Sequence, residues 1–169
     1  MDVRELLADG FGRLPELVAE AVEGLSPEQL TWAPAAGANP IGWLVWHLTR
    51  VQDHHVSDLL DADQIWVTGD WPARFGLAPD PHNTGYGHDP KRVAAVRPDS
   101  ARSLVDYYAA VASRTTALIG DVTPEALDRV VDRRWDPPVT LGVRLTSVLG
   151  DDLQHVGQAA YVRGLLPTI

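Results

Sequence analysis

The stretch Asn39-Pro-Ile-Gly-Trp-Leu-Val-Trp-His-Leu-Thr-Arg-Val-Gln-Asp-His-His-Val-Ser-Asp-Leu59 has the spacing of a long amphipathic helix. Asn39 is a residue type that caps helices, and Pro40 suits the first helical position. A stripe with a period near 3.6 residues follows, made of Ile41, Leu44, Val45, Leu48, Val51, His55, Val56 and Leu59. Such a helix buries one face against other elements of the protein.

Three further segments carry the same period, over roughly residues 3–23, 99–119 and 141–163. Between the first two long helices, Ser26-Pro-Glu-Gln29 predicts the capped start of a short helix. No convincing run of alternating residues indicates a strand. We therefore expect an all-α protein, an antiparallel four-helix bundle in which residues 1–169 form a single domain.

The segment from Ala62 to Arg97 interrupts the helical pattern with glycine, proline and aspartate. A loop of this length inside a compact domain is usually functional or disordered. Its aromatic residues favour an ordered loop, which we expect to pack over one end of the bundle; they are Trp66, Trp71, Phe75 and Tyr86.

The composition excludes several classes of protein. A net charge of −9 argues against nucleic-acid binding, because phosphate contacts need clustered lysine and arginine. The chain has no cysteine, which excludes disulfides and a protein thiol as nucleophile or metal ligand. It shows neither a signal-peptide pattern at its start nor an apolar run of membrane-spanning length. We expect a cytoplasmic protein that does not bind membranes.

A candidate metal site emerges from two distant stretches. Asp151 and His155 in Gly150-Asp-Asp-Leu-Gln-His-Val-Gly-Gln158 are four residues apart, so one helix face presents both. His47 can join them from the second helix. Two imidazoles and one carboxylate leave a coordination position open, as a catalytic zinc-type site requires. The alternative is an ordinary ion pair between Asp151 and His155, with His47 as a partly buried histidine.

Other polar residues compete for roles at this site. Asp152 is the rival carboxylate; it falls near the centre of the apolar stripe, so we expect it to have an arginine or histidine partner and to orient a ligand. His54 is the rival nitrogen ligand, because it follows His47 by seven residues, about two helical turns, and so lies on nearly the same side of the helix. His55 suits packing or the surface, and the loop histidines His82 and His88 could approach the site. Asp152 and His54 are also the candidates for moving a proton during catalysis.

Trp43-x-x-Trp-His47 and His155-Val-Gly-Gln158, with a ligand-type residue four positions before His155, resemble the DinB-like superfamily over nearly the whole chain. The segments Trp66 to Gly87 and Trp135 to Gly142 resemble its actinobacterial branch of mycothiol-dependent S-transferases, which includes a maleylpyruvate isomerase. The resemblance implies a four-helix bundle whose metal ligands are one histidine on the second helix and a His-x-x-x-His pair on the fourth. His47 and His155 match this motif, and Asp151 stands where its other histidine would be.

The resemblance implies zinc as the expected metal, with nickel or another divalent ion as the alternative, because a carboxylate makes the site less selective for zinc. Such a metal would turn an external thiol into a thiolate. The expected function is a transferase that activates a low-molecular-weight thiol, mycothiol, for attack on a small electrophile. Two alternatives remain: a metal-dependent hydrolase that uses water, and a non-catalytic metal- or ligand-binding stress protein. The expected partners are the thiol and the electrophile, and a homodimer is compatible with this interpretation.

Overall fold

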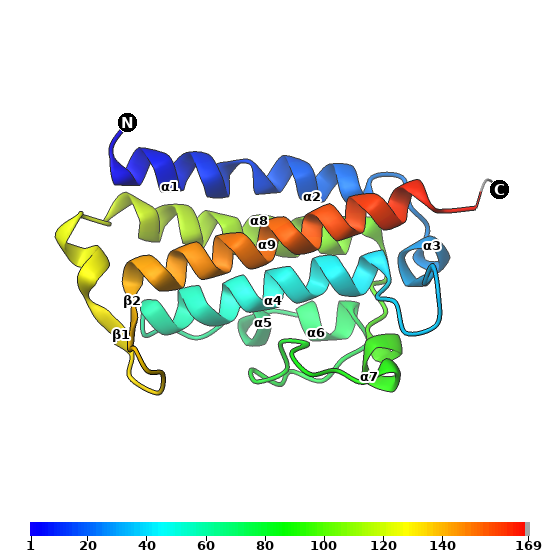
Figure 1. Ribbon diagram of the computed structural model, residues 1–169. Helices are drawn as coiled ribbons and strands as arrows, with labels where there is room; N and C mark the ends of the chain where they lie inside the picture. Colours follow the sequence, from blue (N-terminus) through cyan, green and yellow to red (C-terminus); the bar gives the residue numbers. More distant parts are fainter. Residues whose placement is uncertain (168–169) are drawn as a thin grey trace.

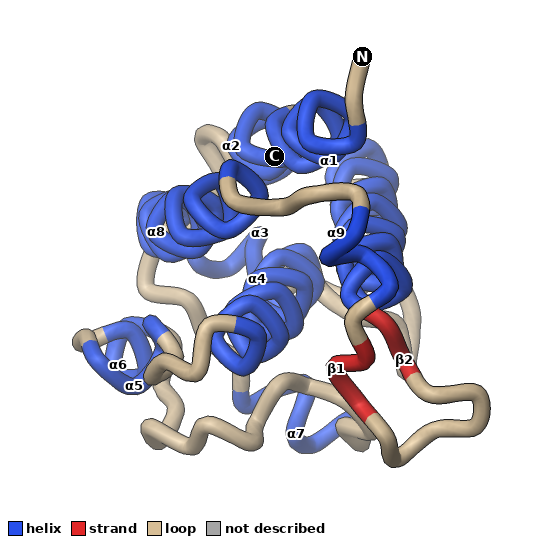
Figure 2. Tube along the Cα trace, turned by 90° about the vertical axis from the view of Figure 1, so that its left-hand side faces the viewer, coloured by secondary structure: helices blue, strands red, loops and turns tan. Residues whose placement is uncertain are grey.

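Four long helical segments pack side by side in a computed structural model that describes residues 1–167 (Figure 1). They are α1 (Val3–Gly12) followed by α2 (Leu14–Val22), α4 (Ile41–Leu59), α8 (Ala101–Gly120) and α9 (Leu141–Gly164). Figure 2 shows the bundle nearly end-on, with α8 and α9 on either side and α4 opposite α1 and α2. The predicted all-α class and its four-helix bundle are confirmed.

The helix directions follow from what lies at each end. A Cβ at Gly42, near the start of α4, would be 2.8 Å from Pro98, just before α8. At the other end, Leu59 and Leu118 pack beside Leu141, the first residue of α9. Thus α4 and α8 run in the same direction, and α9 runs antiparallel to α4. The intervening segment must return the chain along the length of the bundle.

The predicted first helix is interrupted. Its single span of residues 3–23 is wrong at Arg13, which ends α1 and precedes α2. Pro15 explains the interruption, because proline has no N–H and its ring crowds the carbonyl four residues earlier, here that of Phe11. The two helices still continue along one line (Figure 1), so together they form one of the four long segments of the bundle.

The two predicted helix starts behave differently. Helix α3 (Pro27–Thr31) begins with Ser26, whose side chain accepts from the Gln29 N–H while the Gln29 side chain accepts from the Ser26 N–H. That prediction is confirmed. The predicted capping by Asn39 is wrong, because Pro40 occupies the cap position in extended conformation and no side chain caps α4.

A short hairpin was not predicted. After a 3-10 helix, η1 (Glu125–Asp128), strand β1 (Val130–Asp132) pairs antiparallel with β2 (Val139–Thr140). The hairpin is too short to show alternation. Two side chains hold it in place: Arg134 within its loop and Arg144 on α9 both donate to Asp132. These hydrogen bonds, those from Arg134 first, hold the pKa of Asp132 well below its usual range.

The segment between α4 and α8 is ordered, as predicted. It contains α5 (Ile65–Thr68), α6 (Trp71–Arg74) and α7 (Pro90–Ala95), and it buries Trp66 and Phe75 completely. Two details of the prediction are wrong. The segment lies along the side of α4 rather than over a bundle end (Figures 1 and 2), and Tyr86 is 91% exposed rather than packed.

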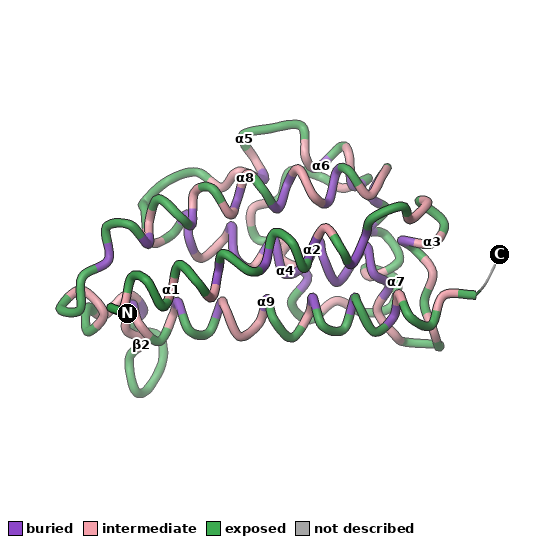
Figure 3. Tube along the Cα trace, turned by 90° about the horizontal axis from the view of Figure 1, so that it is seen from above, coloured by how far each residue is buried: buried purple, intermediate pink, exposed green. Residues whose placement is uncertain are grey.

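Because this segment covers the outer side of α4, 14 of the 19 residues of that helix are buried. Figure 3 marks buried residues in purple, and they line the interior between the long helices. Helix α4 is therefore covered on the bundle side and on the loop side. None of the helices in residues 1–167 is both long and apolar enough to cross a membrane.

A fully buried ion pair attaches the segment to α4. Arg50 Nη1 lies 3.3 Å from Asp53 Oδ2, and both side chains have no exposed surface. Asp53 also accepts from the Ile65 and Trp66 backbone N–H groups and from the Tyr107 hydroxyl on α8.

Arg50 uses its remaining donors on the same segment. It donates to the backbone carbonyls of Pro81 and Asn83 and to the side-chain oxygen of Gln64. Its guanidinium also lies over the Trp66 ring, 4.9 Å from the centroid. With several partners for each buried charge, the pair meets the condition under which burial of charges is tolerated.

Asp53→Asn should therefore destabilise the protein by about 3–5 kcal/mol, because it leaves the Arg50 charge buried without a counter-ion. The matched control is Asp106→Asn, which breaks the surface pair between Asp106 and Arg102 on α8 and should cost at most about 0.5 kcal/mol. Chemical denaturation measures both values. Equal losses in the two variants would contradict the structural role assigned to the buried pair.

Candidate metal centre

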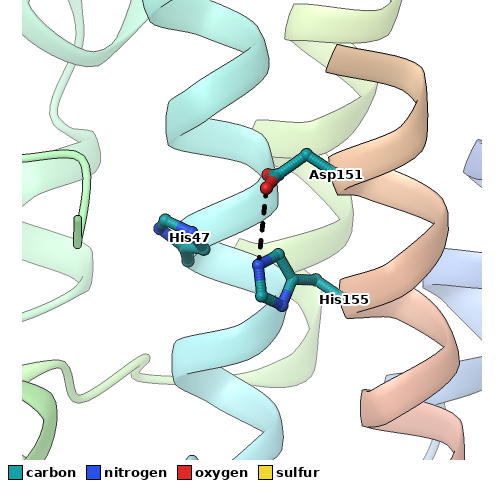
Figure 4. Close-up of side chains that lie close together, drawn as sticks. All are labelled: His47, Asp151 and His155. Carbon is teal, nitrogen blue, oxygen red and sulfur yellow. Dashed lines mark ion pairs between the residues drawn. The ribbon is translucent and has the colours of Figure 1, made fainter. Parts of the chain in front are cut away.

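The three residues that the sequence singled out as metal ligands lie together. His47 comes from α4, and Asp151 and His155 come from the facing side of α9 (Figure 4). Each offers one ligand atom, and these atoms all lie within 4.8 Å of one another. The antiparallel packing of α4 on α9 brings the middles of the two helices together, which makes the group a candidate metal site.

The loop orients His47. Its Nδ1 lies 2.5 Å from the backbone carbonyl oxygen of Thr84, so Nδ1 carries the proton and donates. The lone pair is then on Nε2, the nitrogen left free to bind a metal. Burial lowers the pKa of His47, which favours the neutral imidazole that metal binding needs. The Trp43 ring stacks on the imidazole at 4.6 Å and further restricts its rotation.

His155 is oriented in a similar way. Its Nδ1 lies 2.8 Å from Oε1 of Gln158, one turn further along α9, and its Nε2 faces Asp151 Oδ1 at 3.6 Å (dashed line in Figure 4). Metal-binding histidines commonly have an oxygen partner on the second nitrogen, which fixes the tautomer. Both histidines here meet that description.

Asp151 supplies an independent test of whether a cation fits. Its Oδ2 is buried and has no hydrogen-bond partner among the described residues. A buried carboxylate oxygen without a partner is costly, and a divalent cation between the three side chains would remove the cost. Two neutral imidazoles and a carboxylate form a donor set suited to zinc and related ions, with at least one further coordination position open.

The rival candidates are placed elsewhere. Asp152 points into the core with no exposed surface, and neither of its oxygens has a hydrogen-bond partner among residues 1–167. The expected arginine or histidine partner is therefore wrong. Burial, with the Asp151 charge as a smaller cause, raises the pKa of Asp152 well above its usual range. Its surroundings include Tyr108, whose pKa the carboxylate helps to raise.

None of the remaining histidines joins the three. Both nitrogens of His88 are used, one accepting from Trp43 Nε1 and the other paired with the Asn83 side-chain oxygen. His55 lies against Arg144, and burial followed by that neighbouring charge lowers its pKa to about 4. His54 and His82 line a cleft beside the three ligands without entering the group.

This cleft is the space in which a small molecule would meet the site. It has a volume of about 530 Å³ and is bordered by His47 and Asp151, by the loop residues Thr84 and Tyr86, and by Trp135 in the hairpin. Ligand sites in proteins usually occupy ~300–1,000 Å³. A separate hollow near α3 and α7 is lined by none of the three ligands.

Comparison with known proteins assigns the chain to a family. The family model described as the DinB superfamily matches residues 11–159. This chain belongs to the DinB superfamily. A crystal structure of a conserved protein from Enterococcus faecalis is similar to it, with 32% identity and a TM-score of 0.88 over 98% of this chain and 97% of that one. No curated protein matches the chain.

Two features of this DinB-superfamily site were not predicted from the sequence. One is the Thr84 carbonyl, a backbone group that leaves no signal in residue types. The other is Gly85, at φ +94°, where a Cβ would lie only 2.6 Å from His47 Nδ1 and 3.0 Å from the Trp46 ring. The run Asn83-Thr-Gly-Tyr-Gly87 does carry a turn signal, but nothing in it indicates contact with His47.

Gly85→Ala should reduce metal content sharply, because the added methyl group would displace His47 or the loop that orients it. Gly87→Ala is a matched control, since Gly87 also has a positive φ, +69°, but a Cβ there would meet nothing within 4 Å. Both variants bear the backbone strain and only the first bears the clash. Atomic spectroscopy on purified proteins gives the metal content. Equal metal content in the two would show that the close approach of Gly85 to His47 has no role.

Proposed function

We propose that this DinB-superfamily protein is a metal-dependent transferase that activates a low-molecular-weight thiol, mycothiol, for attack on a small electrophile. The observation that carries the proposal is the convergence of His47, Asp151 and His155 beside the cleft, whose wall includes His47 and Asp151. Two neutral imidazoles and one carboxylate bind a divalent cation while leaving room for a further ligand from the cleft.

Zinc is the expected ion, with nickel or another divalent metal as the alternative, because Asp151 is a harder ligand than the histidine usual at that position. When bound, the metal lowers the pKa of a thiol so that the thiolate is present at neutral pH. The tautomers fixed by Thr84 and Gln158 keep both Nε2 atoms free for this role.

The thiol must come from outside, since the chain has no cysteine. Mycothiol is favoured because two segments resemble mycothiol-dependent S-transferases, Trp66 to Gly87 and Trp135 to Gly142. The cleft supports this choice, because both segments contribute to its walls, the first through His82 and Tyr86 and the second through Trp135. The part of the chain that carries the resemblance is thus the part that would touch a thiol or an electrophile.

Of the two candidates for proton transfer, only His54 lines the cleft, whereas Asp152 is buried away from it. Gln64 donates to His54 Nδ1 at 3.0 Å, and burial lowers the pKa of His54, so the imidazole is neutral at pH 7 with its proton on Nε2. His54 is therefore suited to donate a hydrogen bond to the electrophile. Asp152 does not reach the cleft, so it would influence a reaction only through α9, the helix that also carries Asp151 and His155.

The purified protein should accelerate the reaction of mycothiol with chlorodinitrobenzene, in which a C–S bond forms, chloride leaves and the thiol proton goes to the buffer. Chelation and Asp151→Ala should each lower the rate at least about tenfold, since a free thiol is only about 3% thiolate at pH 7. Glu16→Ala, which removes an exposed carboxylate on α2, should have no effect. Glutathione should react more slowly than mycothiol.

Two results would contradict the proposal. Thiol consumption that persists at full rate after the metal is removed would mean that the site does not activate the thiol. Hydrolysis of a simple ester without any thiol, abolished by chelation, would assign the site to a metal-dependent hydrolase instead.

A further inference from the structure

Trp43 is an aromatic ring that contacts both candidate histidine ligands. It stacks on His47 with a centroid distance of 4.6 Å and an interplanar angle of 14°. It also meets the ring of His155 almost at a right angle, at 6.3 Å and 89°. The residue is only 6% exposed, so neighbouring groups rather than solvent determine where the indole lies. A group that holds this indole therefore restricts both imidazoles.

A hydrogen bond to His88 holds the indole. Trp43 Nε1 donates to His88 Nδ1 at 3.2 Å, although the two residues are 45 positions apart in the sequence. The N–H of a buried tryptophan usually finds a partner. Trp46 and Trp66 are also buried, and their Nε1 atoms have no partner among the described residues. The bond to His88 is thus specific to the one indole that lies on the candidate ligands.

The orientation of His88 is itself determined by its neighbours. Its Nε2 lies 2.8 Å from Asn83 Oδ1, and because a carbonyl oxygen only accepts, Nε2 carries the proton and Nδ1 is the acceptor for Trp43. Burial, followed by the Arg92 charge, lowers the pKa of His88, so the imidazole is neutral at pH 7. Its ring also stacks on Trp46 at 5.8 Å.

His88 belongs to the same turn as the carbonyl that orients His47. The His88 N–H donates to the Gly85 carbonyl at 3.1 Å, and Gly85 follows Thr84, whose carbonyl accepts from His47. The turn therefore holds His47 in two ways, at the edge of the ring through Thr84 and on its face through His88 and Trp43. A ligand that is already oriented loses less freedom when it binds a metal, which raises the affinity.

We infer that His88 is a positioning residue of the candidate metal centre, which holds the Trp43 indole against both histidine ligands and does not itself bind the metal. One of its nitrogens is committed to Trp43 and the other to Asn83, so neither is available to a cation. The expected effect on metal affinity rests on the proposed metal-dependent function, whereas the hydrogen bond does not. Loss of a partner that orients a metal ligand commonly weakens metal binding by about 10–100-fold.

Zinc affinity, measured by competition with a chromophoric chelator, tests this role. His88→Leu and Trp43→Phe each remove the hydrogen bond, the second while it keeps an aromatic ring, and each should weaken zinc binding about tenfold. The double variant should also lose only about tenfold, because both changes remove the same interaction. His88→Asn should recover most of the affinity, since its amide oxygen lies near the position of imidazole Nδ1. Lys91→Leu, at an exposed position on α7, is the matched control and should have no effect.

The indole N–H resonance of Trp43 gives a second readout, in the metal-free protein. Its loss in Trp43→Phe identifies it in proton–nitrogen NMR spectra. The resonance should shift in His88→Leu and stay close to its original position in His88→Asn. The imidazole resonances of His47 should shift in His88→Leu and Trp43→Phe alike. A general loss of stability would not move these particular resonances in the folded protein.

Three results would overturn the inference. Unchanged zinc affinity in His88→Leu would show that the hydrogen bond has no effect on the site. A loss of about a hundredfold in the double variant would show that the two residues act independently. A loss of bound zinc in His88→Asn as large as that in His47→Ala would make His88 a ligand. If the unmodified protein binds no divalent metal, the proposed function fails, and matching shifts of the His47 resonances in metal-free His88→Leu and Trp43→Phe still support the positioning role.

Discussion

The buried pair of Arg50 and Asp53 is the interaction on which the arrangement of the site depends. Neither charge has access to solvent, so each must be compensated by neighbouring groups. Those groups come mainly from the segment between α4 and α8, together with the Tyr107 hydroxyl. Without this pair, the remaining polar contacts between the segment and α4 would be those of Thr84 with His47, of Gln64 with His54 and of His88 with Trp43. With it, the position of the loop backbone along α4 is determined at several points.

Two functional consequences follow from that attachment. Arg50 holds the Asn83 carbonyl, and the next residue, Thr84, offers the carbonyl that orients His47. Through Gln64, Arg50 also determines which nitrogen of His54 carries the proton. A single guanidinium therefore links the tautomers of two histidines seven residues apart, one at the candidate metal site and one at the far end of the cleft. The interaction that stabilises the fold also prepares the site.

The sequence predicted the long helices well because a 3.6-residue period records burial against neighbouring helices. The grouping of His47, Asp151 and His155 was predicted for a related reason, because the spacing of residues along a helix determines which side chains share one face. The sequence did not predict the docking of the loop, because the partners of Arg50 and Asp53 outside α4 lie 12 to 57 residues away and obey no spacing rule. The break at Arg13 depends on a single proline, and the strands of the hairpin are very short. Neither feature changes the periodicity of the sequence enough to be predicted from it.

The most direct test of this account is a crystal structure of the metal-loaded protein with anomalous-scattering data collected at the absorption edge of the bound ion. The account predicts one ion bound by Nε2 of His47, Nε2 of His155 and a carboxylate oxygen of Asp151, at about 2.0–2.2 Å for zinc, with an open coordination position toward the cleft. An ion bound to Asp152 instead of Asp151, or one that leaves His47 on the Thr84 carbonyl without binding it, would contradict the account.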